Sequence, residues 1–172
     1  DLKEAKNVFE RVLRQDLKHL DTHYQMSRLL FESEAFEDAE THVNQCLELD
    51  EEHGLCHQIK GKLGERKGDL EMANTSYRKA IRFAPRNVIA YNRLGDLYER
   101  VLAEAEALQV YQEAVRLNPY DPECRQRIAA ILLRRGQPSD AANYLLESSQ
   151  LAPNEHELLF SIGSAYTQAQ DN

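Results

Sequence analysis

Three of the five prolines in this chain are evenly spaced, and that spacing constrains the fold more than any other feature. Pro85, Pro119 and Pro153 follow one another at intervals of 34 residues. Helices tolerate proline poorly except in their first turn, so evenly spaced prolines mark evenly spaced joints between helices. The chain can therefore be written as rows of 34 residues, with shorter remainders at both ends. These segments are 1–19, 20–53, 54–87, 88–121, 122–155 and 156–172.

Composition favours helices within these rows. The 172 residues include 7 Gly and 5 Pro but no Trp, and good helix formers such as Ala, Leu, Glu, Arg and Gln dominate. Between Glu71 and Phe83, apolar residues recur at spacings of three and four, which is the period of an amphipathic helix. Alternation with a period of two extends nowhere over the length of a strand. We expect an all-α chain of about ten helices.

Aligned rows share residue types at fixed positions. The twentieth position is small in every row, whereas the twenty-fourth is mostly large. A small residue lets two helix backbones approach, and a large residue one turn later fills the space where they diverge. Each row is therefore predicted to be a helical hairpin. The twentieth position holds Ala39, Ala73, Ala107 and Ala141, with Ala5 at the same phase in the first remainder, and the twenty-fourth holds Phe9, Val43, Tyr77, Tyr111 and Leu145.

These positions resemble the tetratricopeptide repeat family. Its 34-residue unit has an aromatic residue, Leu-Gly and Tyr in the first helix, and Ala, an aromatic residue, Ala and Pro in the second. Leu102 departs from the pattern, because a glycine normally turns the hairpin there, and Lys60 and Gly64 replace apolar residues. The resemblance implies a right-handed α-α superhelix, a solenoid of helical hairpins. The third row matches every family position with Tyr91, Leu94, Gly95, Tyr98, Ala107, Tyr111, Ala114 and Pro119.

The rows predict one repeat domain over residues 1–172. Its four full repeats would be 20–53, 54–87, 88–121 and 122–155, preceded by a second helix at 1–19 and followed by a first helix at 156–172. Terminal repeats normally carry a polar cap. Here Phe9 and Leu13 at one end and Leu159 and Ile162 at the other are apolar. We therefore expect the chain to be a segment of a longer array.

Charge and hydropathy narrow the classes of partner. The formal net charge is −8 at pH 7 and the isoelectric point is near 5.3. Nucleic-acid binding needs clustered Lys and Arg, so an acidic chain of this kind is not expected to bind it. No apolar run reaches the roughly 18 residues of a membrane span, and residues 1–4 have no signal-peptide core. The expected partner is a protein or peptide.

The cysteines predict neither a disulfide framework nor a zinc site. Cys46, Cys56 and Cys124 are odd in number and widely separated, which favours a reducing compartment. No phosphate loop, nucleophile elbow or metalloprotease helix is present. We expect no catalytic residue and no cofactor.

Two histidine pairs have the spacing of metal ligands on one helix face. His19 with His23 and His53 with His57 are each four residues apart. The two pairs are themselves offset by 34 residues, so the repeat explains them without a metal. We therefore predict no metal site.

The resemblance implies that the first helices line a concave groove in which extended partners bind. At the positions that the family directs into this groove, basic residues prevail although the whole chain is acidic. Arginines there would bind carboxylates of an acidic peptide, and amide side chains would bind its backbone. The candidate partner-binding residues are Tyr24, Arg28, Gln58, Lys62, Arg66, Asn92, Arg93, Arg100, Gln126, Arg127 and Arg134.

Three roles remain open. The first is a non-enzymatic interaction scaffold that holds an acidic segment or a partner subunit in a groove with a basic centre. The second is a structural or oligomerisation element that contacts others through its convex face or its open repeat ends. The third is the substrate-recognition arm of a larger enzyme.

The basic residues at the groove positions also have a simpler explanation. Pairs such as Arg28–Glu32 and Asp96–Arg100 have ordinary i,i+4 helix spacing, which is typical of a solvated helix face.

Overall fold

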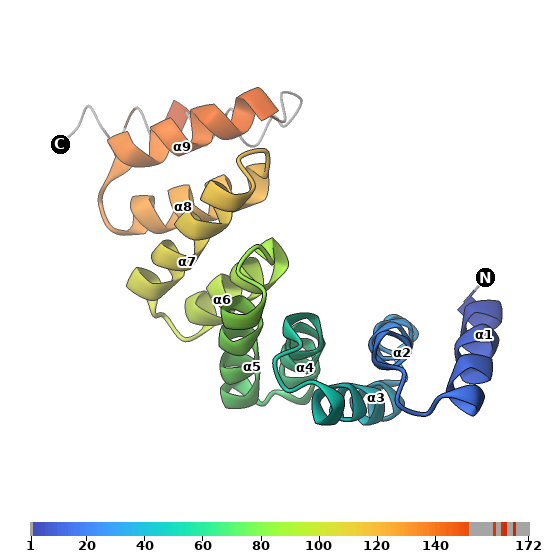
Figure 1. Cartoon of the computed structure of the whole chain (residues 1–172). Helices are drawn as coiled ribbons and strands as arrows, with labels where there is room; N and C mark the ends of the chain where they lie inside the picture. Colours follow the sequence, from blue (N-terminus) through green and yellow to red (C-terminus); the bar gives the residue numbers. More distant parts are fainter. Residues whose placement is uncertain (1, 152–159, 161–162, 165–166, 168–172) are drawn as a thin grey trace. The chain divides into compact units, whose positions relative to one another are not determined.

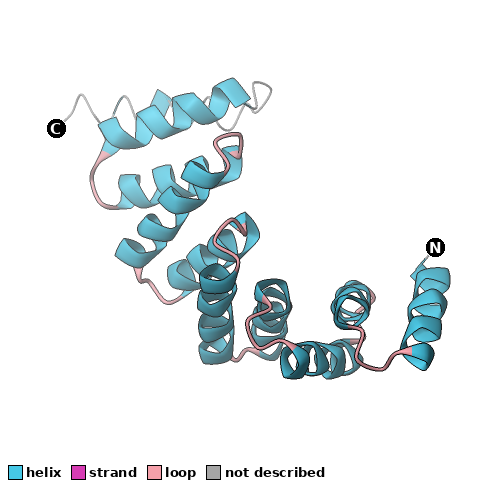
Figure 2. Ribbon diagram, in the orientation of Figure 1, coloured by secondary structure: helices cyan, strands magenta, loops and turns pink. Residues whose placement is uncertain are grey.

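The computed structural model describes residues 2–151, 160, 163–164 and 167 (Figure 1). Every regular element in this part of the chain is a helix (Figure 2), which confirms the all-α expectation. None of these helices has both the length and the apolar character that crossing a membrane requires. The helices are α1 (Leu2–Gln15), α2 (Leu20–Glu32), α3 (Phe36–Leu49), α4 (Gly54–Lys67), α5 (Leu70–Phe83), α6 (Val88–Arg100), α7 (Glu104–Leu117), α8 (Pro122–Arg134) and α9 (Pro138–Leu151).

The first helix of each predicted row begins at the first residue of that row, because the residue before it caps the helix. The capping side chain accepts a hydrogen bond from a backbone N–H of the first turn, which would otherwise lack a partner. The predicted helix at 156–172 lies almost entirely outside the described residues. The caps are His19 to Thr22 N at 3.3 Å, His53 to Cys56 N at 3.2 Å, Asn87 to Ala90 N at 3.3 Å and Asp121 to Glu123 N at 3.0 Å.

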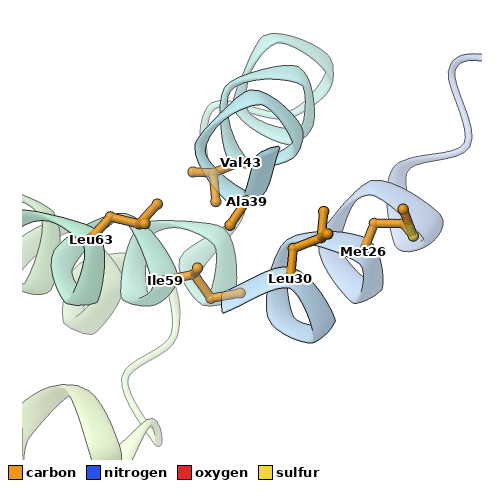
Figure 3. Packing of buried hydrophobic residues seen from close by; sticks show 6 residues of the cluster. All are labelled: Met26, Leu30, Ala39, Val43, Ile59 and Leu63. Carbon is orange, nitrogen blue, oxygen red and sulfur yellow. The ribbon is translucent and has the colours of Figure 1, made fainter. Parts of the chain in front are cut away.

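The chain falls into two compact units, Asp1–Ala90 and Tyr91–Asn172. In the first unit, side chains from α2, α3 and α4 converge in one hydrophobic cluster (Figure 3). Its members are Met26, Leu30, Ala39, Val43, Ile59 and Leu63, each at most 3% exposed. In the second unit the buried residues of α7 and α8 include Ala107, Tyr111, Ala114, Cys124 and Ile128.

Alanine at the helix crossings is buried as expected. Ala39, Ala73, Ala107 and Ala141 are all 0% exposed. Each lies near the start of a second helix, where its small side chain allows close packing against the first helix of the same hairpin. The pairs α2–α3, α4–α5 and α8–α9 are accordingly in extensive contact.

Each hairpin turns through one residue in the left-handed backbone region. Gly68 and Gly136 have φ values of 74° and 69°, as glycine readily does. Glu34 and Leu102 occupy the same position in the other two hairpins, with φ values of 61° and 58°. A side chain in this conformation costs about 1–2 kcal/mol. The missing glycine at position 102 therefore leaves the turn intact but strained.

Candidate partner-binding surface

In the first unit, two of the predicted basic residues lie over aromatic rings. Lys62 Nζ is 5.6 Å from the ring centroid of Phe31, and Arg66 Cζ is 5.2 Å from that of Phe36. The two rings contact each other edge to face, with centroids 5.4 Å apart. A cation over an aromatic face is stabilised by about 0.5–1 kcal/mol at an exposed site. The rings of α2 and α3 therefore hold the two cations of α4 in place.

Arg28 adds a third cation to this surface. It occupies the ninth position of its row, as Lys62 does in the next row, and the helices α2 and α4 that carry them are in contact. Arg28 Nε lies 4.0 Å from Glu32 Oε1, and both side chains are more than half exposed, at 56% and 58%. Such an exposed pair contributes little to stability, so Arg28 stays available for other acids. We call Arg28, Phe31, Phe36, Lys62 and Arg66 the α2–α4 face.

In the second unit, two predicted arginines are compensated by carboxylates of neighbouring helices. Arg134 Nη2 lies 2.8 Å from Glu99 Oε1, and its Nε lies 2.6 Å from Glu104 Oε1. Arg127 Nη1 is 3.5 Å from Glu99 Oε2. The hydrogen bonds that Arg134 donates to Glu104 and Glu99 raise the pKa of Arg134 above its usual value. The positive charges of these two arginines of α8 are therefore compensated by carboxylates of α6 and α7.

The hydroxyl of Tyr111 adds two hydrogen bonds to this network of charges. It donates to Asp96 Oδ1 at 2.6 Å and to Glu99 Oε2 at 3.2 Å. Burial and the hydrogen bond to Asp96 raise the pKa of Tyr111 well above its ordinary value. The phenol thus stays neutral and acts as a donor that holds the carboxylates of α6 toward the arginines of α8.

Arg93 and Arg100 differ from Arg127 and Arg134. Both lie exposed on α6, and neither has a hydrogen-bond or ion-pair partner among the described residues. The pair expected between Asp96 and Arg100 is absent from that part of the chain, because Asp96 accepts from Tyr111 instead. In the second unit these two arginines carry the uncompensated part of the predicted basic centre.

The candidates at the fifth position of the first three full rows contact the residue that caps the following hairpin. The Tyr24 ring lies 5.4 Å from that of His53. Asn87 Nδ2 donates to Gln58 Oε1 at 2.7 Å, and Asn92 Nδ2 donates to Asp121 Oδ2 at 3.2 Å. Gln58 is only 8% exposed. These side chains join successive hairpins, a role that the sequence did not predict.

Gln126 also has its amide directed to a neighbouring helix. Its Nε2 donates to Ser148 Oγ at 3.4 Å, and that hydroxyl donates in turn to the carbonyl of Pro122 at 3.1 Å. Ser148 is fully buried. Gln126 therefore belongs to the packing of α8 against α9.

The cysteines depart from expectation. Cys46 and Cys56 form a disulfide with Cα atoms 6.6 Å apart, so the expectation of no disulfide is wrong. The argument for a reducing compartment rested on that expectation and loses its basis with it. Cys124 is free and buried. Burial and the nearby Asp121 raise its pKa to about 12.

The histidines serve two separate roles within their pairs. His19 and His53 cap helices, whereas His23 and His57 are buried. His23 Nδ1 lies 2.9 Å from His42 Nδ1. The ring of His57 stacks on Phe83 with centroids 5.7 Å apart. Because capping and burial direct the two members of a pair to different neighbours, neither pair is arranged as a chelate.

The structure is a series of helical hairpins in which the first helix of each hairpin is capped by the residue before it, an arrangement typical of repeat scaffolds. Comparison with known proteins identifies the repeat family. The tetratricopeptide repeat model matches residues 1–63 and 104–161, and a TPR repeat model matches residues 66–101. The chain belongs to the tetratricopeptide repeat family, whose members serve generally as protein-interaction scaffolds.

Similar curated proteins are much longer than this chain. The TPR repeat-containing protein PA4667 of Pseudomonas aeruginosa is 32% identical over 105 residues, which are 60% of this chain and 18% of that protein. The peroxisomal targeting signal receptor of Saccharomyces cerevisiae is 30% identical over 104 residues, 60% of this chain and 16% of that protein. The chain thus spans less than a fifth of these relatives.

Solved structures share the fold at low identity. YrrB has a TM-score of 0.82 at 21% identity, covering 95% of this chain and 84% of that one. MamA has a TM-score of 0.78 at 18% identity, covering 89% of this chain and 90% of that one. These likenesses show the helical-hairpin fold.

Proposed function

We propose that the chain is a non-enzymatic scaffold that binds an extended acidic segment of a protein partner on the α2–α4 face. The observation that carries the proposal is the placing of Lys62 and Arg66 over the rings of Phe31 and Phe36. Cations already held beside apolar surface lose little side-chain entropy on binding. The face is therefore preorganised for a ligand that alternates carboxylates with apolar groups.

The chemistry of the face favours acidic ligands. Arg28, Lys62 and Arg66 lie on two neighbouring first helices, so an extended segment that crosses both helices would meet a cation at each. Charge-assisted hydrogen bonds to carboxylates are about twice as strong as neutral ones. The half-buried rings beside the cations would take the apolar side chains of the same segment.

Two similar proteins support a peptide as the class of partner. YrrB is described as a TPR protein with an unusual peptide-binding site, and the yeast relative is named a targeting signal receptor. In the second unit, Arg93 and Arg100 provide a further acidic-segment contact, whereas Arg127 and Arg134 are engaged with Glu99. Tyr24, Gln58, Asn92 and Gln126 would support this binding indirectly by fixing successive helices.

The test is fluorescence anisotropy with a labelled peptide of alternating glutamate and leucine. We expect the double variant Lys62→Glu with Arg66→Glu to weaken binding by about tenfold or more, a loss of roughly 1.4 kcal/mol. The matched control is Lys79→Glu with Arg82→Glu on α5. It makes the same charge change and likewise removes a cation over a ring, since Arg82 Cζ lies 5.4 Å from the Phe83 centroid.

The control separates the proposal from its rivals. Equal weakening by both double variants would mean that overall charge, and not the α2–α4 face, attracts the peptide. If the chain instead acts through self-association, light scattering would show a mass that rises with concentration and that neither variant changes. If it is the recognition arm of a larger enzyme, the face still binds the segment and the proposal holds for the arm.

A further inference from the structure

Two sulfur atoms and an imidazole converge at the joint between the first two full hairpins. Cys46 lies near the end of α3, Cys56 lies in the first turn of α4, and His53 caps α4. One ring nitrogen of His53 and the two Sγ atoms all lie within 4.8 Å of one another. Both cysteines are 0% exposed, whereas His53 is half-buried.

We propose that, once the disulfide is reduced, Cys46, Cys56 and His53 form a binding site for a single zinc ion. This site lies apart from the α2–α4 face and does not depend on the proposed function. Thiolate sulfur and imidazole nitrogen are the ligands that zinc prefers in proteins. Three protein ligands would leave the fourth tetrahedral position to water.

Formation of the site balances in electrons, protons and charge. Two equivalents of a small thiol reductant supply two electrons and two protons, which cleave the Cys46–Cys56 bond and leave a disulfide of the reductant. Zinc then displaces the two thiol protons and binds two thiolates and a neutral imidazole. Two negative charges and a divalent cation sum to zero. A neutral assembly suits the buried sulfurs, since an uncompensated buried charge is costly.

The backbone spacing accommodates both states. Tetrahedral bonds of about 2.3 Å from zinc to each sulfur would place the sulfurs roughly 3.8 Å apart. The Cα atoms of Cys46 and Cys56 are 6.6 Å apart, so rotation of the side chains supplies this separation without moving α3 from α4. The His53 ring is already positioned by the hydrogen bond from Cys56 N at 3.2 Å and by the ring of Tyr24.

Other joints of the array show that the fold does not itself require these ligands. The residues at the same repeat positions as Cys46, Cys56 and His53 are Ala80, Ala90 and Asn87 at the next joint. At the joint after that they are Ala114, Cys124 and Asp121. Both cysteine positions accommodate alanine at these joints, since Ala80, Ala90 and Ala114 are 0% exposed. Burial at these positions therefore does not by itself require cysteine, and two cysteines and a histidine occupy them together at one of the described joints.

The experiment uses Co²⁺ as a spectroscopic probe for the zinc site. Reduced protein under anaerobic conditions is titrated with Co²⁺, and absorption from thiolate-to-cobalt charge transfer is followed in the near ultraviolet. We expect saturation at one ion per chain and displacement by one equivalent of Zn²⁺. The oxidised protein should show no such absorption. Absence of the band from the reduced wild type would overturn the proposal.

Alanine variants test the ligands with little disturbance of the fold, because Ala80 and Ala90 occupy both cysteine positions at the next joint. We expect Cys46→Ala and Cys56→Ala each to weaken Co²⁺ binding by about a hundredfold or more, and Cys124→Ala to leave it unchanged. Survival of the charge-transfer band in Cys46→Ala or Cys56→Ala, or its loss in Cys124→Ala, would refute the site. Circular dichroism verifies that each variant is folded.

The role of His53 is tested by asparagine, which keeps the helix cap as Asn87 does at the next joint. His53→Asn should weaken Co²⁺ binding by about tenfold or more. His19→Asn, the same change at the preceding cap, should not alter it. An unchanged affinity in His53→Asn would remove His53 from the site and contradict the proposed ligand set.

Discussion

Gly95 and Tyr111 fit together so closely that any side chain on the first would collide with the second. A Cβ atom at position 95 would lie 2.5 Å from Cε1 of the Tyr111 ring. Gly61 and Tyr77 repeat this relationship in the preceding hairpin, also at 2.5 Å. In the other two full rows the tyrosine is replaced by a smaller residue, and the glycine that faces it is replaced by a larger one. Those combinations are Ser27 with Val43 and Ala129 with Leu145.

Gly95→Ala should therefore lower the free energy of unfolding by about 1–3 kcal/mol, because the added methyl forces the tyrosine ring or its helix to move. Urea unfolding measures the change. The double variant Gly95→Ala with Tyr111→Leu recreates the combination of the fourth row. We expect the double variant to lose less free energy of unfolding than the two single variants together, by about 1 kcal/mol or more. Additive losses would show that the two residues do not constrain each other.

Leu102→Gly should stabilise the protein. Leu102 has a φ of 58° and is 83% exposed, so glycine relieves the backbone strain and removes almost no packing. The expected gain is about 1 kcal/mol, read from the midpoint of urea unfolding. Gly136→Leu makes the reverse change at the equivalent turn and should cost a similar amount. A destabilised Leu102→Gly variant would contradict the account of the turn.

Stability should fall with acid below about pH 6.5. Burial lowers the pKa of His57, and Lys79 and Lys60 lower it further against the opposing effect of the Glu51 carbonyl. Burial, followed by the charge of His23, lowers the pKa of His42. Below pH 6.5 the unfolded chain then binds more protons than the folded one, so stability rises with pH across that window.

A His57→Phe variant tests this pH dependence. Phenylalanine keeps the stacking on Phe83 but cannot be protonated, so the melting temperature should fall less steeply with acid than in the wild type. Thermal unfolding followed by circular dichroism at a series of pH values measures the slope. An unchanged slope would mean that His57 does not contribute to it.

Cys124 should resist alkylation in the folded protein. Its pKa of about 12 leaves about one thiolate in 10⁵ at neutral pH, and the thiol is buried. In the oxidised protein Cys124 is the free thiol, so mass spectrometry after iodoacetamide treatment reports on it directly. Modification should become fast once the protein is denatured. Equally fast modification of the folded protein would show that the site is open.

Much of the fold follows from the sequence because it depends on the repeat. Prolines at a constant interval predicted the rows, and α2, α4, α6 and α8 begin where the rows begin. The alanines at the crossings are buried as predicted. The left-handed turn at Leu102 appears where the family has glycine. Such features repeat in every row, so alignment of the rows reveals them.

Contacts between neighbouring helices were harder to predict. Cys46 and Cys56 occupy different positions of their rows, so alignment of the rows does not pair them. Predicting their disulfide requires knowing that the last turn of one hairpin lies beside the first turn of the next. Their separation of 10 residues across a joint was the available signal. Arg134 pairs with Glu104 across 30 residues, a contact that helix periodicity does not give.

A charge-reversal experiment tests the central claim most directly. The Lys62→Glu with Arg66→Glu variant and the wild type are each titrated with a glutamate–leucine peptide and with a lysine–leucine peptide. If the α2–α4 face binds acidic segments, the wild type will bind the acidic peptide more tightly and the variant will prefer the basic one by about tenfold or more. The same preference in both proteins would contradict the account.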